Sequence, residues 1–238
     1  MKKFIIVLSV LFVISCATVP TISPPPQKII IEVLSATNQK VEVKENQVNK
    51  SMEVHNPEGQ LSNLSFISNG KAFVKIFSGL SVSDVTRLWN DFVILENTTN
   101  IKEVHLFINS PGGDAFSGLA LSDTIEAAKK KGFCITAHAS GIIASAAVPV
   151  FAVCNIRIAS AGTIFMVHEA AIWKWPGRET ASDIRTQNKM MNMLAERYRK
   201  YLTDNSKVDD AVWKEMETAT TWFTAKEAMD FGLVDKIE

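Results

Sequence analysis

The sequence predicts a mixed α/β fold in which mainly parallel strands are covered by helices. Apolar runs of strand length alternate with segments of helical periodicity from residue 71 to the end of the chain, an order typical of parallel sheets with helices packed on them. One of these runs ends in a glycine turn that opens the next helical segment. The 238 residues, less an N-terminal leader, leave enough chain for one sizeable core.

The first 15 residues have the composition of a secretory signal. Lys2 and Lys3 precede an apolar stretch over residues 4–14, which is too short to cross a bilayer comfortably. The tetrapeptide Val-Ile-Ser-Cys that ends at Cys16 resembles a bacterial lipobox, in which the cysteine is lipidated and becomes the first mature residue. Several acyl chains on one cysteine anchor a protein stably. An ordinary signal peptide with an incidental cysteine is the alternative.

We therefore expect an exported protein of the bacterial cell envelope, held to a membrane through Cys16 and facing outside the cytoplasm. Residues 16–27 hold this anchor and a proline cluster, whose extended, semi-rigid backbone suits a stalk. Residues 28–69 form an extension with one β-like run at 29–34, which either adds an edge strand or stays partly mobile. The main domain is predicted to cover residues 70–238.

The main domain is predicted to begin with a strand over residues 71–77 and a helix over residues 81–97. Ser81 and Asp84 mark the start of the helix, because small polar caps and acidic side chains are favoured there. The apolar face of this helix is predicted to contain Val85, Leu88, Trp89, Phe92 and Leu95.

The next strand, over residues 104–108, leads into Asn109-Ser110-Pro111-Gly112-Gly113 and then a helical pattern over residues 117–130. Glycine lets the backbone approach a ligand closely or adopt a positive φ. Amides exposed just before a helix can face a developing negative charge, as they do in an oxyanion hole. A simple turn is the alternative interpretation of Pro-Gly-Gly.

A strand-like run over residues 133–138 leads into Gly141-Ile142-Ile143-Ala144-Ser145 and an apolar helix that continues to residue 153. Ser145 is thus predicted at the start of a buried helix. Small neighbours leave room for a substrate carbonyl there, and the helix N-terminus favours negative charge. A helix start that is small only for close packing is the alternative.

An apolar strand over residues 163–168 ends in His168, at the boundary with a loop. A serine nucleophile needs a base with a pKa near neutrality, and His168 is the best placed candidate downstream of Ser145. A hydrogen-bonded structural histidine is the alternative. The order of the three segments favours a serine peptidase site.

In their order and their residues these segments resemble the Clp protease proteolytic subunit family. The shared motifs are Asn-Ser-Pro-Gly-Gly, then Gly-x-x-Ala-Ser, then Met-x-His, and the resemblance covers roughly residues 70–238. Residues 225–235 are similar to the C-terminal signature of the family. The resemblance implies a crotonase-like (ClpP) spiral of repeated β-β-α units. It also implies that Ser145 is the nucleophile, His168 the general base, and the backbone amides of Gly113 and Ala146 the oxyanion donors.

The third catalytic residue of the family, an aspartate, falls on Thr220 in this chain. A carboxylate there normally fixes the histidine tautomer, and its loss can cost on the order of 10⁴ in rate. Four nearby acidic residues are candidates to replace it, namely Asp209, Asp210, Glu215 and Glu217. A Ser-His dyad assisted by Thr220, a backbone carbonyl or water is equally open.

A long amphipathic helix is predicted over residues 180–202, with Met190, Met191, Met193 and Leu194 as core or subunit contacts. Family members form stacked rings partly through a helix here, so the resemblance implies a homo-oligomer. Residues 170–177, with two tryptophans around Lys174, could be a substrate loop, a subunit interface or a membrane contact. Thr224 and Glu227 form a capping box, and Gly232 ends the last helix.

Composition argues against several classes of partner. The net charge is zero and no basic stripe carries interleaved aromatic residues, so nucleic acid is not an expected partner. The four histidines have no metal-ligand spacing, and neither a metal nor another cofactor is expected. Cys134 and Cys154 lie in apolar runs and are expected to be buried free thiols, with a disulfide as the alternative.

The sequence therefore predicts an exported, lipid-anchored serine endopeptidase that acts on peptides or unfolded proteins. The resemblance implies an ATP-driven unfoldase in the cytosol as the usual family partner, which an exported domain would not meet, so we expect cleavage without ATP. One alternative is a Ser-Lys peptidase with Lys189 or Lys174 as the base. Another is a catalytically silent scaffold or binding protein, for which Thr220 argues.

Overall fold

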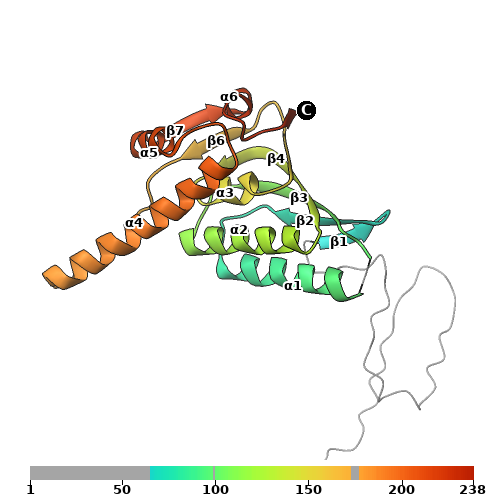
Figure 1. The fold of residues 1–238 in the computed structure, drawn as a ribbon, viewed down its shortest axis with the longest axis horizontal. Helices are drawn as coiled ribbons and strands as arrows, with labels where there is room; N and C mark the ends of the chain where they lie inside the picture. Colours follow the sequence, from blue (N-terminus) through green and yellow to red (C-terminus); the bar gives the residue numbers. More distant parts are fainter. Residues whose placement is uncertain (1–64, 99, 173–176) are drawn as a thin grey trace, which may run out of the picture. The chain divides into compact units, whose positions relative to one another are not determined.

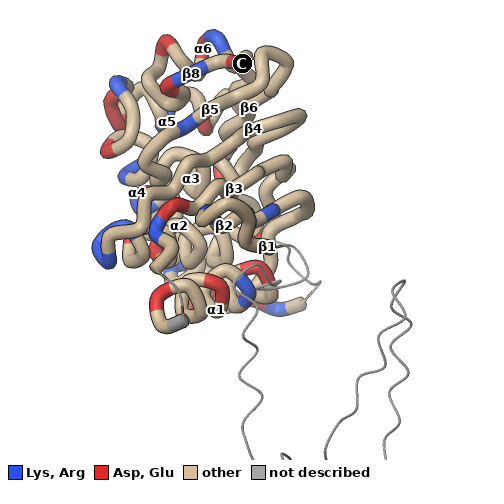
Figure 2. The backbone as a smooth tube through the Cα atoms, turned by 90° about the vertical axis from the view of Figure 1, so that its right-hand side faces the viewer, with Lys and Arg blue, Asp and Glu red and all other residues tan. Residues whose placement is uncertain are grey.

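The structure, a computed structural model, describes residues 65–98, 100–172 and 177–238. Its strands form one sheet with the order β1-β2-β3-β4-β5-β8, and β6 joins through β4 and pairs with β7. Figure 2 shows the strands stacked in this order. Their bounds are β1 Ser65–Ser68, β2 Lys71–Ile76, β3 Glu103–Ser110, β4 Cys134–Ala144, β5 Ile156–Ala159, β6 Ile164–Val167, β7 Thr221–Thr224 and β8 Lys236–Ile237.

The strands pair in parallel at every described junction except β1 with β2 and β6 with β7. Parallel neighbours need a crossover, and the helices provide it. Their bounds are α1 Val82–Thr98, α2 Ala115–Lys130, α3 Ala147–Ala152, α4 Ala181–Asp204, α5 Asp210–Ala219 and α6 Ala225–Asp230. The prediction of mainly parallel strands covered by helices is confirmed.

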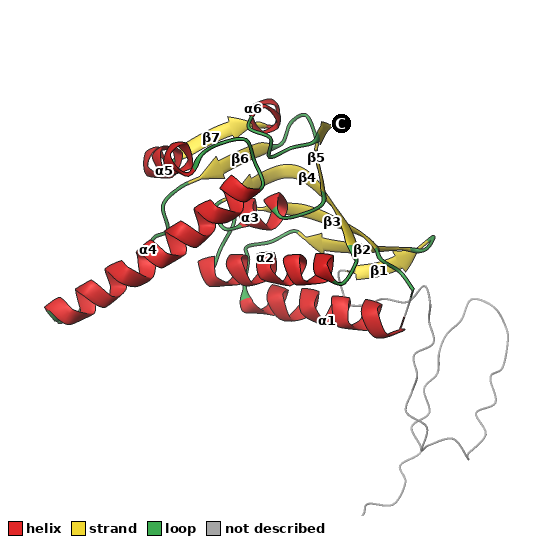
Figure 3. Ribbon diagram, viewed as in Figure 1, coloured by secondary structure: helices red, strands yellow, loops and turns green. Residues whose placement is uncertain are grey.

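The core lies between the sheet and the helices α1, α2 and α3, which cover one face of it (Figure 3). Strand β3 has one face in this core. Val104, Leu106 and Ile108 point to that face and are fully buried, whereas His105 and Phe107 point to the opposite face and are half-buried. All six residues of α3 are buried, as its unbroken apolar sequence requires.

Helix α4 extends away from the other elements over its first half (Figure 1). No residue from 181 to 189 is buried, whereas Leu194, Arg199 and Leu202 in the second half are. That half packs on α2, α3 and α5. The helix begins at Thr180 with a capping box to Asp183, which satisfies the first free amides.

Two local predictions are wrong. Trp89 is 56% exposed, because it lies about 100° further round the helix than Leu88, outside the stripe that faces the sheet. Cys134 is exposed, because it points to the opposite face of β4 from the buried Ile135. Cys154 is buried as expected, and both thiols are free.

The predicted capping box at the start of α6 is confirmed, since Thr224 Oγ1 accepts from the Glu227 amide and Glu227 reaches back to the Thr224 amide. In the three described ranges, the helices lack the combination of length and apolar sequence needed to cross a bilayer.

Candidate active site

Ser145 occupies a sharp turn between the end of β4 and the start of α3. Its φ is +54°, a left-handed conformation that costs a non-glycine residue on the order of 1–3 kcal/mol. The turn is held by hydrogen bonds on both sides of the residue. The Ser145 amide donates to Met166 O at 2.8 Å, and its carbonyl accepts from the Val148 amide at 3.0 Å and the Tyr198 hydroxyl at 3.2 Å.

His168 follows the last residue of β6, a strand that pairs in parallel with the end of β4 through Ala144 and Met166. Parallel strands end at the same edge of a sheet, so this pairing brings Ser145 and His168 together. His168 Nε2 lies 2.8 Å from Ser145 Oγ, and both side chains are half-buried. This distance is within the range that proton transfer from serine to a base requires.

Gly112 and Gly113 form the turn opposite the serine, with φ of +92° and +151°. A Cβ on Gly112 would lie 2.7 Å from both Ala144 O and Ser145 Cβ, so only glycine permits this close approach. The Leu80 amide donates to Gly112 O at 2.8 Å, and the Asp114 amide donates to Leu80 O at 3.0 Å. These bonds use the groups on either side of the Gly113 amide and leave that amide unused.

The backbone amides of Gly113 and Ala146 are therefore available to a ligand. Neither donates a hydrogen bond to the part of the chain that the structure describes. Both residues line the same cavity as Ser145 and His168. Two free amides beside a serine are the arrangement that stabilises a developing oxyanion.

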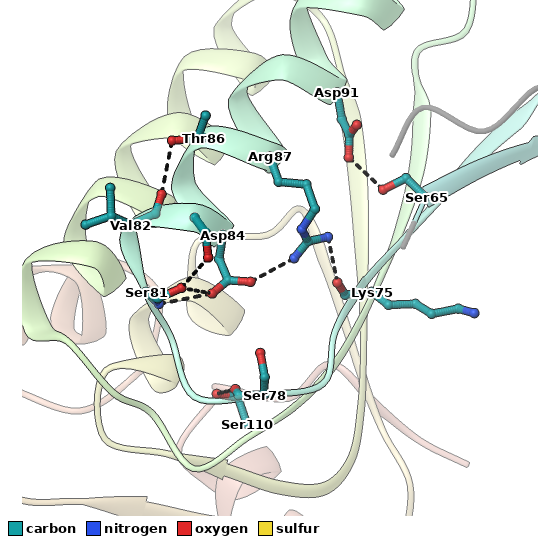
Figure 4. A network of polar contacts seen from close by, with 11 residues as sticks. Ser65, Lys75, Ser78, Ser81, Val82, Asp84, Thr86, Arg87, Asp91 and Ser110 are labelled. Carbon is teal, nitrogen blue, oxygen red and sulfur yellow. Dashed lines mark hydrogen bonds and ion pairs between the residues drawn. The ribbon is translucent and has the colours of Figure 1, made fainter. Parts of the chain in front are cut away.

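Ser110, just before the glycine turn, is bonded to Ser78 in the segment that precedes α1 (Figure 4). Ser110 Oγ donates to Ser78 O at 2.6 Å and accepts from the Gly112 amide at 3.2 Å. These two bonds tie the end of β3 to residue 78 and fix the start of the turn.

The segment that carries Ser78 is itself fixed to α1. Arg87 donates to Lys75 O at 3.0 Å and to Asp84 at 2.9 Å, and Ser81 donates to Asp84 from its amide and hydroxyl (Figure 4). Burial acts to raise the pKa of Asp84, but the bonds from Ser81 and Arg87 prevail and lower it. The carboxylate stays charged and the predicted helix start at Ser81 is confirmed.

A cavity of about 660 Å³ opens beside the serine, a size in the usual range of roughly 300–1,000 Å³ for ligand sites. Its walls are mainly apolar and come from the start of α2, residues 190–198 of α4 and the segment after His168. They include Phe116, Leu119, Ile172, Met190, Met191 and Leu194. Met190 and Met191, predicted as core or subunit contacts, line this cavity, whereas Met193 is 60% exposed and the subunit contact stays a prediction.

Thr220 does not occupy the position of a third catalytic residue. It caps the C-terminus of α5 in a left-handed conformation, with φ of +53°, and its side chain is exposed. Of the four acidic residues that the sequence offered in its place, Asp209, Asp210 and Glu215 are exposed, whereas Glu217 is buried and lines the cavity with His168.

Tyr198 is a site residue that the sequence analysis missed. It lines the cavity and its hydroxyl contacts the Ser145 carbonyl. The spacing of Met191, Leu194 and Tyr198 along α4 could have indicated this, because residues three and four apart share a helix face.

The remaining candidates are placed as follows. Lys189, one proposed alternative base, is exposed on the projecting half of α4. Lys174, the two tryptophans beside it and Cys16 lie outside the described residues. No group of three or more His, Cys, Asp or Glu side chains that could hold a metal ion occurs among the residues the structure describes.

Comparison with known proteins gives one consistent result. A model of the Clp protease family matches residues 70–238. An ATP-dependent Clp protease proteolytic subunit of Bacteroides thetaiotaomicron is 27% identical over 168 residues, covering 68% of this chain and 73% of its own length. Subunit 3 of the same protease from Parasynechococcus marenigrum is 30% identical and covers 68% and 80%.

A solved structure of a point mutant of ClpP1 from Listeria monocytogenes superposes with a TM-score of 0.61. At 21% sequence identity the match covers 70% of this chain and 90% of that one. It shows that the two chains share a mixed α/β fold, and the predicted crotonase-like class is confirmed.

Proposed function

We propose that this chain, which belongs to the Clp protease family of serine peptidases, is an exported, lipid-anchored endopeptidase that cleaves peptides or unfolded proteins without ATP. Family membership makes it a serine-type hydrolase and implies protein or peptide substrates and a homo-oligomer. The observation that carries the proposal is the 2.8 Å contact between His168 Nε2 and Ser145 Oγ, at one end of an apolar cavity.

In the proposed reaction Ser145 Oγ attacks the carbonyl carbon of the scissile bond while His168 Nε2 takes its proton. The negative charge that develops on the carbonyl oxygen is held by the amides of Gly113 and Ala146. His168 returns the proton to the leaving amine as the carbon–nitrogen bond breaks. Water then hydrolyses the acyl-serine by the same steps, with His168 again acting as base and acid.

The test is labelling of the full-length protein with a fluorophosphonate, with the adduct mapped by mass spectrometry. We expect the adduct on Ser145, and its loss in Ser145→Ala and in His168→Ala. The exposed Ser140→Ala is the matched control and should label like the wild type. If His168→Ala still labels, the base is a lysine and not His168. A folded wild type that does not label would favour the alternative of a catalytically silent scaffold or binding protein.

Independence from ATP is proposed because an exported domain has neither ATP nor a cytosolic unfoldase, although the relatives are named ATP-dependent. The purified protein alone should cleave short peptides and casein. Inactivity that is relieved only by adding a cytosolic ATP-driven unfoldase would contradict this.

The lipid anchor is proposed on the basic start, the short apolar run and Cys16. In a bacterial host the wild type should incorporate labelled palmitate and sediment with membranes, while Cys16→Ala should do neither. Unlabelled wild-type protein in the cytoplasm would rule out both export and anchoring.

A further inference from the structure

The Glu217 carboxylate is unusual among the acidic residues of the described chain. The residue is 3% exposed, and Oε1 has no hydrogen-bond partner within the described residues. Buried carboxylates normally have partners, because an unpaired one forfeits its hydration without compensation. An unpaired oxygen at the wall of the candidate active site is therefore the feature that calls for a functional explanation.

Glu217 lies in the last turn of α5, against the chain that carries the base. Its backbone carbonyl accepts a hydrogen bond at 3.2 Å from the amide of Glu169, the residue after His168. The side chains of Glu217 and His168 line the same cavity. The tertiary structure thus places the Glu217 carboxylate in the wall of the cavity that His168 lines, three residues before Thr220 in the sequence.

The other nearby carboxylates are already engaged or face away. Asp114 also lines the cavity, but it is exposed and caps α2 by accepting from the Ser117 amide at 2.8 Å and hydroxyl at 2.6 Å. Glu169 is exposed and its carboxylate faces Thr218 at 3.5 Å. Among the described residues that line the cavity, Glu217 is the acidic one with a buried carboxylate oxygen that accepts no hydrogen bond.

Glu217 is ionised above a pKa of about 7, which reflects its burial and the charges around it. Arg199 Nη1 approaches Glu217 Oε2 at 3.3 Å, while Arg199 Nε makes a shorter contact of 2.9 Å with Asp210. One guanidinium is shared by two carboxylates, so the ionised cluster carries a net negative charge. Burial raises the pKa of Glu217 to about 7, with Arg199 acting in the opposite direction.

We propose that Glu217 takes over the role of the missing aspartate as a positioning residue for His168. When the histidine gains the serine proton, the Glu217 carboxylate accepts the hydrogen bond of the Nδ1–H and stabilises the imidazolium. The proton stays on the histidine and no bond to Glu217 forms. This inference rests on the proposed serine peptidase function and extends it.

The test compares Glu217→Gln, which removes the charge at nearly constant volume, with Glu215→Gln, an exposed position on the same helix. We expect Glu217→Gln to slow labelling of Ser145 by about 10²–10⁴-fold and Glu215→Gln to leave it unchanged. Because a Glu217 anion would stabilise the imidazolium, its loss should also shift the pH of half-maximal labelling downward. A purely structural role would not move this pH.

Glu217→Asp is the second variant, because it keeps a carboxylate at this buried position. It should label at least about tenfold faster than Glu217→Gln. Urea denaturation of each variant shows whether it is folded under the labelling conditions.

Three results would overturn the inference. They are a wild-type rate in a folded Glu217→Gln, a slowed Glu217→Gln whose pH profile matches that of the wild type, and a folded Glu217→Asp that labels no faster than Glu217→Gln. All of these leave the proposed function intact, because that function fails only if wild-type Ser145 does not label or does not need His168.

Discussion

At the scale of single residues, the site depends on backbone conformations that few side chains tolerate. Ser145 keeps a positive φ because three hydrogen bonds hold its amide and carbonyl. Gly112 lets the opposite turn come within van der Waals reach of the serine. Strain of this kind is maintained only where the surrounding structure over-determines the backbone, and it often marks catalytic sites.

We predict that Gly112→Ala abolishes labelling of Ser145, because the new Cβ would collide with Ala144 O and Ser145 Cβ at 2.7 Å. Gly132→Ala is the control, since Gly132 also has a positive φ but open space around its Cβ position. The strained φ should cost both variants about 1–2 kcal/mol of unfolding free energy, and overpacking should cost Gly112→Ala about 1–3 kcal/mol more. Urea denaturation and labelling measure the two effects, and equal behaviour of the variants would refute the steric argument.

At the scale of elements, α4 links the outer part of the domain to the nucleophile. Its first half projects, and its second half packs against α2, α3 and α5 while Tyr198 reaches the Ser145 carbonyl. Burial raises the pKa of Tyr198 well above its usual range, so the hydroxyl remains a neutral donor. A displacement of α4 would therefore change the hydrogen bond from Tyr198 to the Ser145 carbonyl, and with it the strained turn.

Tyr198→Phe should lower the labelling rate of Ser145 about fivefold, because a neutral hydrogen bond contributes about 1 kcal/mol and the ring volume is kept. Tyr201→Phe, on the same helix, removes a hydroxyl that bonds to Asp123 instead and should label normally. If both variants label at the wild-type rate, the contact from α4 does not position the turn.

At the scale of the whole molecule, the buried Glu217 should make the stability of the domain depend on pH. A carboxyl whose pKa is about 7 in the folded state and 4.5 as a model group binds its proton more tightly when folded. The folded state is then favoured at low pH, and this contribution is lost as pH rises from about 4.5 through about 7. Over this whole pH range the contribution of Glu217 to the free energy of unfolding changes by about 3 kcal/mol.

We predict that Glu217→Gln becomes more stable relative to the wild type as pH rises from 5 to 8, by about 2–3 kcal/mol. Urea denaturation of both proteins at each pH gives the difference in their free energies of unfolding. Groups that titrate alike in the two proteins do not contribute to this difference. Glu215→Gln is the control and should show no such trend. A difference that stays constant from pH 5 to 8 would contradict the raised pKa.

Local sequence predicted the elements well where one pattern decides the structure. The strand at residues 104–108, the buried apolar helix after Ser145 and the capping box at Thr224 all form as expected, because each depends on neighbours within a few residues. Trp89 and Cys134 were misplaced because an apolar residue can lie just outside the buried face of its helix, as Trp89 does, or on the opposite face of its strand, as Cys134 does.

The sequence by itself determined the fold class, the family and the segments that carry Ser145, His168 and the glycine turn, because these depend on local periodicity and short motifs. Only the tertiary structure decided which side chains meet. Strand pairing brings His168 to Ser145, helix packing brings Tyr198, and α5 turns Glu217 into the cavity while Thr220 faces solvent. Contacts between residues so far apart depend on the packing of whole elements, which no short stretch of sequence encodes.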